Sequence, residues 1–542
     1  MASIPTFKQH LYYALAISFT GFTYGWEVAS MGGVLAMPQF LDWFGNPSAF
    51  RQGAMTAALI AGEFAGSLLI GFFLADRFGR RKTIFTAIAI YLIGQAIVVA
   101  SQSQAMFIAG RVVNGLGAGG LIQTIPLYTA EITPPKIRGR ILSMLNSGIA
   151  IGLVVAYWVQ YGALNISGNG AWQVCFGLQL VPAAIVAVVM LFRPESPRWL
   201  VRHDRSEEAL QVLAKLHGEC DADNVIVRAE FEEIKVSVEM DNQIKPPSYP
   251  TLIFGKQYRR RTALAMGIQF MQQVSGVNII LYYAAKVFAQ TGQGGTSAAL
   301  LSNGIGSALF LGATLSMSVF IDHIGRRRPL FVGPALAGFC LIVVGAMLLS
   351  FGQPYYDNIT QAIQFNFQNK AAGNAAIAFM FLFEIVIGFT FNATVWTYQN
   401  EVFSINARGR GTALATATNW FTNYWLGLFI PEALNKAGWK LYFIFGAINV
   451  TSSVVIFLFY PETCLRTLEE LDLLFTRNRT VFAFMDREAC TKGSMLLHTL
   501  AEGQEASATD IGEALKAELV MGGAVRVNKK DLEGIASHVE KV

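Results

Sequence analysis

The sequence contains twelve apolar segments that are separated by polar or charged loops. An apolar helix of about 20 residues can cross the ~30 Å of hydrocarbon in a bilayer. Inside lipid the backbone must satisfy its own hydrogen bonds, so these segments predict an all-α membrane protein with twelve transmembrane helices. They lie at residues 10–34, 53–75, 84–101, 105–128, 141–162, 172–192, 262–290, 297–321, 329–351, 373–400, 410–432 and 438–460. Only 14% of the residues are charged, whereas a soluble protein carries roughly 25%.

Three short charged signatures occur once in each half of the chain, at nearly equal separations. They are residues 76–81 and 322–327 (246 positions apart), Glu131 with Arg138 and Glu401 with Arg408 (270 apart), and Pro194–Ser196 and Pro461–Thr463 (267 apart). Near-equal separations mean that the halves share one plan. Duplicated halves in a membrane chain are typical of carriers that rock around a central site. We therefore predict two pseudo-symmetric six-helix lobes, at 1–192 and 262–462.

Two polar segments complete the domain plan, a cytoplasmic linker at 193–261 and a cytoplasmic tail at 463–542. In the linker, Ser206 can cap a short amphipathic helix that continues to Leu216. Lysine and arginine are concentrated in every second loop, for example at 77–82. Because basic loops stay on the cytoplasmic side, we expect both termini in the cytoplasm.

Several sequence strings make the chain resemble the sugar porter family of the major facilitator superfamily over about residues 10–475. They are residues 76–81, Pro126–Glu131 with Arg138-Gly139, Pro194–Leu200, Gln272–Asn278 with Tyr282-Tyr283, and Pro461–Thr463 with Leu468–Glu470. The long tail and the overall character of the sequence resemble those of fungal members of the family. The resemblance implies a two-lobed major facilitator fold that works by alternating access.

Span 7 places amide and hydroxyl side chains on an apolar background. These residues are Gln272, Gln273, Ser275, Asn278, Tyr282 and Tyr283. Such groups donate and accept hydrogen bonds at once, which suits an uncharged polyhydroxylated solute. Gly276 is expected to loosen the helix so that Gln273 and Asn278, ~140° apart on an ideal helix, both reach a cavity. The alternative is that these side chains only join neighbouring helices by hydrogen bonds.

The resemblance implies further substrate contacts outside span 7. Family members stack a sugar ring and bond its hydroxyls at positions that match Trp396, Asn419 and Trp420. For each tryptophan alone, anchoring at the membrane interface is the alternative. Asn146 stands where the family usually has glutamine, and residues 391–395 replace the usual Trp-Gly-Pro before the tryptophan. These departures put ordinary hexose recognition in doubt.

Charged residues at the inner ends of the spans form two matching sets. They are Asp76, Arg80, Arg81, Glu131, Arg138 and Glu195 in the first half, and Asp322, Arg326, Arg327, Glu401, Arg408 and Glu462 in the second. We expect ion pairs that latch the cytoplasmic side while the site faces outward, because such pairs bias a two-state equilibrium by a few kcal/mol. The alternative is that the charges only set topology, which would explain the basic residues but not the repeated acids.

A carboxylate in the middle of span 1, Glu27, is the predicted proton-coupling residue, with Arg111 on span 4 as its partner. Proton-coupled sugar porters resemble this stretch but carry aspartate at that position. An approaching arginine favours the ionised carboxylate and a receding one favours the protonated form, which ties proton binding to motion. A static buried ion pair is the alternative, and Glu63 and Glu384 are competing intramembrane carboxylates.

The predicted function is secondary active transport of a sugar (a mono- or small saccharide) or a polyol by alternating access, with proton symport. The alternatives are a passive facilitator, an exporter of a small oxygenated metabolite and a sugar sensor. An enzyme is not expected, because the sequence shows no Walker-type loop, metal-ligand cluster or nucleophile–base set. We expect no cofactor, no metal and no nucleic-acid partner, and a monomer in the lipid bilayer of the plasma membrane. Asn165 and Asn358 begin glycosylation sequons in loops that are expected outside.

Overall fold

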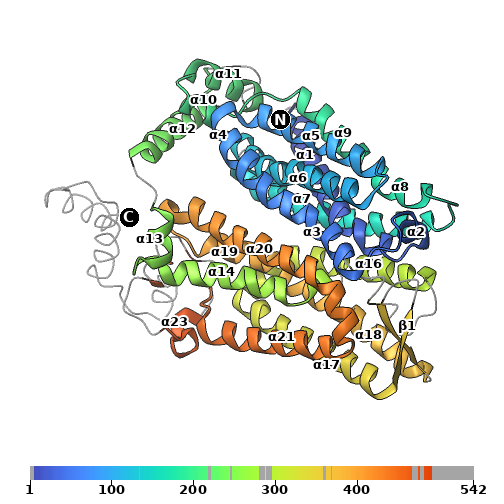
Figure 1. Ribbon diagram of the computed structural model, residues 1–542. Coiled ribbons are helices and arrows are strands. Elements are labelled where there is room, and N and C mark those ends of the chain that lie inside the picture. The colour runs from blue at the N-terminus through green and yellow to red at the C-terminus, as the bar shows by residue number, and fades with distance from the viewer. Residues whose placement is uncertain are drawn as a thin grey trace.

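The chain forms a bundle of long helices in two lobes (Figure 1). The computed structural model describes residues 5–133, 135–217, 221, 223–243, 247–279, 283, 287, 296–357, 362–367, 369–464, 466, 471, 474–475 and 481–490. Within these residues, nine helical segments are long and apolar enough to cross a membrane. The helices α1 (Pro5–Val34), α14 (Arg259–Val274) and α20 (Ile405–Ala437) lie beside them in the same bundle.

The N-terminal lobe contains the helices of the first half of the chain. They are α1, α3 (Ala49–Gly66) with its continuation η1 (Ser67–Leu74) and α4 (Ala75–Phe78), α5 (Arg80–Val99), α6 (Gln104–Ile132), α7 (Pro135–Ala163), and α8 (Gly170–Gly177) with α9 (Leu180–Leu191). A short helix, α2 (Pro38–Trp43), follows α1. Glycines let α3 and α6 approach closely, because a Cβ on Gly115 would collide with the carbonyl of Leu59. Small residues commonly serve this purpose between membrane helices.

The C-terminal lobe contains the corresponding helices of the second half. They are α14, α16 (Thr296–Ile324), α17 (Arg327–Phe351), α18 (Lys370–Ile387) with η2 (Gly388–Asn392) and α19 (Ala393–Glu401), α20, and α21 (Lys440–Phe459). The predicted span at 373–400 is therefore interrupted by a π-helical turn. In this turn Thr390 donates its hydroxyl to the carbonyl of Val386 at 2.6 Å. Such turns are frequent at functional sites.

The loop between α17 and α18 contains a hairpin that the sequence did not predict. Strands β1 (Gly352–Asp357) and β2 (Ala362–Phe367) pair antiparallel, with Gly352 opposite Phe367. Phe365 and Phe367 are buried while Asn366 is exposed, which is the alternation of a strand with one covered face. Burial of these two aromatic side chains therefore fixes the hairpin against the bundle.

The helices of the linker pack against different lobes. Helices α10 (Pro197–Arg202), α11 (Ser206–His217) and α12 (Val225–Gln243) lie beside the N-terminal lobe (Figure 1). Trp199 on α10 donates its indole N–H to the carbonyl of Asp76 at 2.9 Å. By contrast, α13 (Tyr249–Phe254) packs its Leu252 with Ala265 and Phe403 of the C-terminal lobe. The predicted helix that begins at Ser206 is confirmed.

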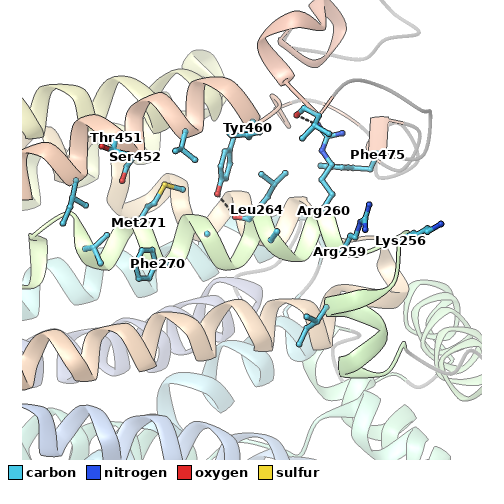
Figure 2. A pocket seen from close by; sticks show the side chains of 18 of the residues that line it. Lys256, Arg259, Arg260, Leu264, Phe270, Met271, Thr451, Ser452, Tyr460 and Phe475 are labelled. Carbon is cyan, nitrogen blue, oxygen red and sulfur yellow. Dashed lines mark hydrogen bonds between the residues drawn. The ribbon is translucent and has the colours of Figure 1, made fainter.

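We call the side of the bundle that carries the linker helices and residues 76–81 and 322–327 the basic side. The other side, which carries α2 and the β1–β2 hairpin, is called the opposite side (Figure 1). In the C-terminal lobe a cleft of about 1330 Å³ separates α14 from α21 near the basic side (Figure 2). Among the described residues after α21 are η3 (Ala483–Met485) and α23 (Arg487–Cys490). Most of the predicted tail lies outside the described residues.

Candidate translocation site

Buried amides connect α14, α19 and α20 in the C-terminal lobe. Asn419 on α20 donates from Nδ2 to Oε1 of Gln269 (2.6 Å) and of Gln272 (3.2 Å) on α14. Gln269 donates to Oε1 of Gln399 on α19 at 2.7 Å. Gln272 donates to the carbonyl of Phe391 in η2 at 3.4 Å. An amide both donates and accepts, so each contact of this kind can be exchanged for one with a hydroxyl of an uncharged solute.

A second group of amides lies just beyond the end of α14. The helix ends at Val274, and Gly276 has φ +94°, a conformation that glycine adopts without strain. Asn278 donates to Oε1 of Gln273 and, at 2.8 Å, to Oδ1 of Asn423 on α20. The helix is therefore interrupted at Gly276 as predicted, and Gln273 and Asn278, which would lie ~140° apart on an unbroken helix, come together. That both amides reach a cavity stays a prediction.

The other predicted substrate residues lie in different environments. Trp420 is buried, and its ring meets that of Tyr24 on α1 edge-on, with the centroids 6.2 Å apart. This contact joins the two lobes. Trp396 on α19 and Asn146 on α7 are half-buried. Tyr282 lies outside the described residues. The structure thus brings the amides of span 7 and Asn419 together, but it gives Asn146 no described contact with them.

A buried ion pair lies in the interior of the N-terminal lobe. Arg111 on α6 donates from Nη1 to Oε1 of Glu27 on α1, and at 3.2 Å to the hydroxyl of Ser30. Tyr91 on α5 donates its hydroxyl to the other carboxylate oxygen of Glu27 at 3.0 Å. The side chain of Arg111 is 1% exposed and that of Glu27 is fully buried, so the pair is shielded from solvent. A pair of charges in such a place is costly to separate unless a proton neutralises the carboxylate.

Two further carboxylates are buried, one in each lobe. Neither oxygen of Glu63 on α3 has a hydrogen bond among the described residues. Glu384 on α18 lines a cavity of about 10 Å³ with Asn303 on α16 and Tyr157 on α7. That space suits about one water molecule. Of Glu27, Glu63 and Glu384, it is Glu27 that forms an ion pair with arginine in the described part of the chain.

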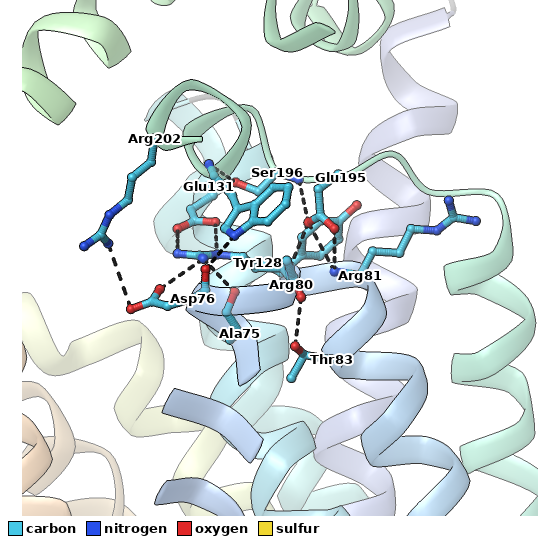
Figure 3. A network of polar contacts seen from close by, with 12 residues as sticks. Ala75, Asp76, Arg80, Arg81, Thr83, Tyr128, Glu131, Glu195, Ser196 and Arg202 are labelled. Atoms are coloured by element: carbon cyan, nitrogen blue, oxygen red, sulfur yellow. Dashed lines mark hydrogen bonds and ion pairs between the residues drawn. The ribbon is translucent and has the colours of Figure 1, made fainter. Parts of the chain in front are cut away.

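Five of the six predicted gate residues of the N-terminal lobe form one cluster at the basic side (Figure 3): Asp76, Arg80, Arg81, Glu131 and Glu195. Arg80 binds both carboxylate oxygens of Glu131, from Nε at 2.9 Å and from Nη2 at 3.0 Å. Its Nη1 reaches Asp76 at 3.1 Å. The carboxylate of Glu195 accepts the backbone N–H of Arg80 at 2.8 Å and that of Arg81 at 3.2 Å. The cluster therefore ties α4, α5, α6 and the segment before α10 together.

The C-terminal lobe has a similar cluster that differs in how the glutamate is held. Nε and Nη2 of Arg326 both approach Oε1 of Glu401, at 3.3 and 3.0 Å. The hydroxyl of Thr463 donates to the second oxygen of Glu401 at 2.6 Å. The carboxylate of Glu462 accepts the backbone N–H groups of Arg326 at 2.9 Å and Arg327 at 3.1 Å. The second carboxylate oxygen is thus held by a neutral hydroxyl instead of the arginine.

These clusters act within the lobes. Every ion pair that the structure describes among the gate residues joins helices or segments of the same lobe. Arg408 is half-buried and directs Nη2 to the carbonyl of Phe403 at 3.5 Å. The side chains of Arg138 and Asp322 lie outside the described residues. A latch that joins one lobe to the other therefore stays a prediction.

The two lobes contact each other toward the opposite side. Gly53 on α3 lies against Leu428 on α20 so closely that a Cβ would collide with the leucine carbonyl. Gly304 on α16 packs against the ring of Trp158 on α7. In Figure 1 the lobes approach each other near α16 and lie farther apart near α12 and α13. The described interlobe contacts therefore lie away from the basic side.

The sequence over most of this chain matches a known family. The profile described as Sugar (and other) transporter covers residues 13–475. The chain belongs to this family. A high-affinity glucose transporter of Kluyveromyces lactis is 35% identical over 477 residues, which cover 86% of this chain and 86% of that protein. A quinate permease of Neurospora terricola is 32% identical over 486 residues, which cover 86% of this chain and 89% of that protein.

A solved structure agrees with the family assignment at the level of the fold. The inward open structure of the xylose transporter XylE from E. coli matches with a TM-score of 0.69 and 23% identity, covering 86% of this chain and 99% of that one. This sugar transporter family member therefore has the major facilitator fold and is an integral multi-pass membrane protein. The predictions of the family, of the fold and of a transporter in place of an enzyme are confirmed.

Three amides of the network were not among the predicted site residues of this transporter. Gln269 lies one helical turn before Gln272, so its position on the same face could have identified it. Asn423 lies four residues after Asn419 on α20, so its position on the same face could have identified it as well. Gln399 lies on another helix beside a second amide, Asn400, and the sequence does not indicate which of the two faces the network. In this network Gln399 accepts a hydrogen bond from Gln269, which lies 130 positions away in the sequence. Only the folded structure brings them together.

Proposed function

We propose that this sugar transporter family member is a proton symporter that imports a sugar or a closely related polyol by alternating access. The buried pair of Glu27 and Arg111 is the observation on which the proton-linked part rests. An uncharged solute would bind among the amides of the C-terminal lobe, where Gln272 and Asn419 meet. The relative named as a high-affinity glucose transporter supports this class of solute.

The proposed coupling follows from the placement of the ion pair. Glu27 is on α1 and Arg111 is on α6, so a change in the spacing of these helices weakens or restores their contact. A carboxylate that loses its arginine in an apolar interior takes up a proton, because an isolated charge is too costly there. Tyr91 donates to the ionised form and favours the proton-free arrangement. Proton uptake and helix movement are thereby linked.

The test uses cells that lack their own sugar carriers and that express the full-length chain. Labelled sugars, polyols and organic acids are screened for uptake with and without an inward proton gradient. We expect one neutral polyhydroxylated solute to be concentrated only when the gradient is present. The variant Glu27→Gln should abolish this accumulation but retain exchange of labelled for unlabelled solute, because a neutral amide cannot carry the proton. Accumulation at the wild-type level in this variant would remove Glu27 from the mechanism.

The control variant is Asn423→Gln, which keeps an amide in the C-terminal network. It should alter the apparent affinity for the solute while accumulation still follows the proton gradient. If Glu27→Gln and wild type both equilibrate the solute without concentrating it, the chain is a passive facilitator. Binding of the solute together with a cytoplasmic signal and without transport would favour the sensor alternative.

A second candidate is transport, including export, of another small oxygenated metabolite. The relative named as a quinate permease favours it. So does the polar composition of η2, where Asn392 donates to the hydroxyl of Thr314 at 3.4 Å. The organic-acid arm of the same screen, run in both directions, distinguishes this candidate from sugar import. We further propose a monomer in the plasma membrane, with both termini and the basic side in the cytoplasm.

A further inference from the structure

The cleft between α14 and α21 is separate from the amide network. Its described lining comes from these two helices, from Ile253 and the residues just after α13, and from Tyr460, Phe475 and Val481 (Figure 2). Gln269 and Gln272, which belong to the network, do not contribute to the described lining. The described lining of the cleft thus shares no residue with the network.

Two hydrogen bonds between α14 and the α21 segment set the length of the cleft. Near the basic side the hydroxyl of Tyr460 donates to the carbonyl of Leu264 at 3.0 Å. Farther along, Asn449 donates from Nδ2 to the carbonyl of Ser275 at 2.7 Å. From Leu264 to Ser275 a helix rises about 16 Å. This length matches one leaflet, which contributes about 15 Å of hydrocarbon.

The wall of the cleft is largely apolar along this length. Ala263, Phe270 and Val274 line it from α14, and Ala447 and Val455 line it from α21. Phe270 is 48% exposed, although the helix lies in the membrane part of the bundle. An exposed apolar wall at this depth is matched by hydrocarbon, not by water. An acyl chain satisfies this requirement.

The basic end of the cleft carries three cations. Lys256, Arg259 and Arg260 line it there (Figure 2). Arg260 is engaged, because it donates to the carbonyl of Val481 at 3.1 Å and lies over the ring of Phe475. Lys256 and Arg259 are exposed, and the described contacts include no acidic partner for either. A basic pocket between membrane helices on the cytoplasmic side is the kind of site that attracts anionic headgroups.

We infer that the cleft binds an anionic phospholipid from the leaflet on the basic side. One acyl chain lies between α14 and α21, and the headgroup, with its net negative charge, contacts Lys256 and Arg259. The complementarity of charge at one end and of hydrocarbon along the wall selects this occupant. A sterol would leave the two cations without a partner, and a zwitterionic lipid would place its own cation beside them. A bound lipid would support the face of α14 that lies away from the amide network.

The test is native mass spectrometry of the full-length protein released from mild detergent. Phosphatidylserine and phosphatidylcholine with the same acyl chains are supplied in equal amounts. We expect phosphatidylserine to be retained roughly 25-fold more strongly, the ratio expected from two basic contacts at about a fivefold effect each. The variant Lys256→Gln with Arg259→Gln should remove this preference. The matched control, Lys82→Gln with Lys235→Gln, neutralises two exposed lysines on the N-terminal lobe side and should leave the preference unchanged.

A second variant examines the hydrocarbon part of the site. Ala447→Trp fills the cleft from α21 and should reduce retention of both lipids, and Ala447→Leu should reduce it less. Thermal unfolding in detergent verifies that each variant is folded. Equal retention of the two lipids by the wild type would overturn the inference. The inference would also be overturned if the control variant lost the preference for phosphatidylserine as fully as Lys256→Gln with Arg259→Gln does. Displacement of phosphatidylserine by a sterol would overturn it as well.

Discussion

The two lobes differ in their buried polar centres although their helices follow one plan. In the N-terminal lobe the buried polar centre is the ion pair of Glu27 and Arg111. In the C-terminal lobe it is a set of neutral amides around Asn419 and Asn278. Glu27 and Asn278 each stand two residues after a glycine, in or just beyond the first helix of their lobe.

This difference suggests a division of labour that one lobe alone could not provide. A buried ion pair responds to protons because a charge left without its partner must be neutralised. Neutral amides do not titrate, and they can exchange hydrogen bonds with hydroxyls at any physiological pH. A proton-linked lobe and a solute-binding lobe meet where Tyr24 contacts Trp420. We expect mutations in the two centres to have separable effects.

The largest effect is expected when the arginine of the buried ion pair is removed. Arg111→Leu leaves the carboxylate of Glu27 buried without its cation, which costs about 3–5 kcal/mol. Thermal unfolding of the purified protein in detergent measures the loss. Asn278→Ala, in the amide network of the other lobe, should cost only about 1 kcal/mol, because it removes neutral hydrogen bonds. Equal losses at the two positions would contradict the contrast between the lobes.

The double variant Glu27→Gln with Arg111→Leu serves as the control for this prediction. It removes both charges, so the penalty of an unpaired carboxylate disappears and most of the stability should return. If the double variant is as unstable as Arg111→Leu alone, loss of packing around the arginine is the cause. The contact of the guanidinium with the ring of Phe176, 5.7 Å from its centroid, would then be the next interaction to examine.

A smaller effect is expected in the amide network, and it should appear in affinity. Asn419→Ala removes the donor shared by Gln269 and Gln272 and leaves two buried acceptors without it. A loss of about 1–3 kcal/mol raises the KM for the solute roughly 5- to 150-fold. The pH dependence of uptake should stay that of the wild type. A shifted pH profile in this variant would show that the two centres are not separable.

The sequence predicted the large elements of this fold because membrane helices leave a strong signal. Runs of about 20 apolar residues are required by the bilayer whatever the tertiary contacts are. The hairpin of β1 and β2 was missed because its strands are short and because only the burial of Phe365 and Phe367 identifies its covered face. The π-helical turn at Gly388–Asn392 was missed because a span interrupted by one such turn keeps its hydropathy.

The site was predicted less completely than the fold. Glu27 and Arg111 could be paired from the sequence, since an isolated charge in a span needs a partner. The partners of the amides could not be assigned, because a neutral amide can bond to any neighbouring helix. The sequence also left open that Arg326 would share Glu401 with Thr463, since that depends on how the segment after α21 turns back.

The smallest effect is expected from exchanging arginine for lysine in the two gate clusters. Arg80 holds both oxygens of Glu131 with a planar pair of donors, whereas Arg326 approaches one oxygen of Glu401. Lysine is a point charge and cannot reproduce the paired geometry. Arg80→Lys should therefore destabilise the protein by about 1 kcal/mol more than Arg326→Lys, since only Arg80 loses a paired contact with both oxygens of one carboxylate. Thermal unfolding in detergent compares the variants, with Lys82→Arg as a neighbouring control that contributes no described ion pair. Equal losses of stability would show that the hydrogen bond from Thr463 to the second oxygen of Glu401 does not lessen the role of Arg326. The two clusters would then be equally strong despite their different contacts.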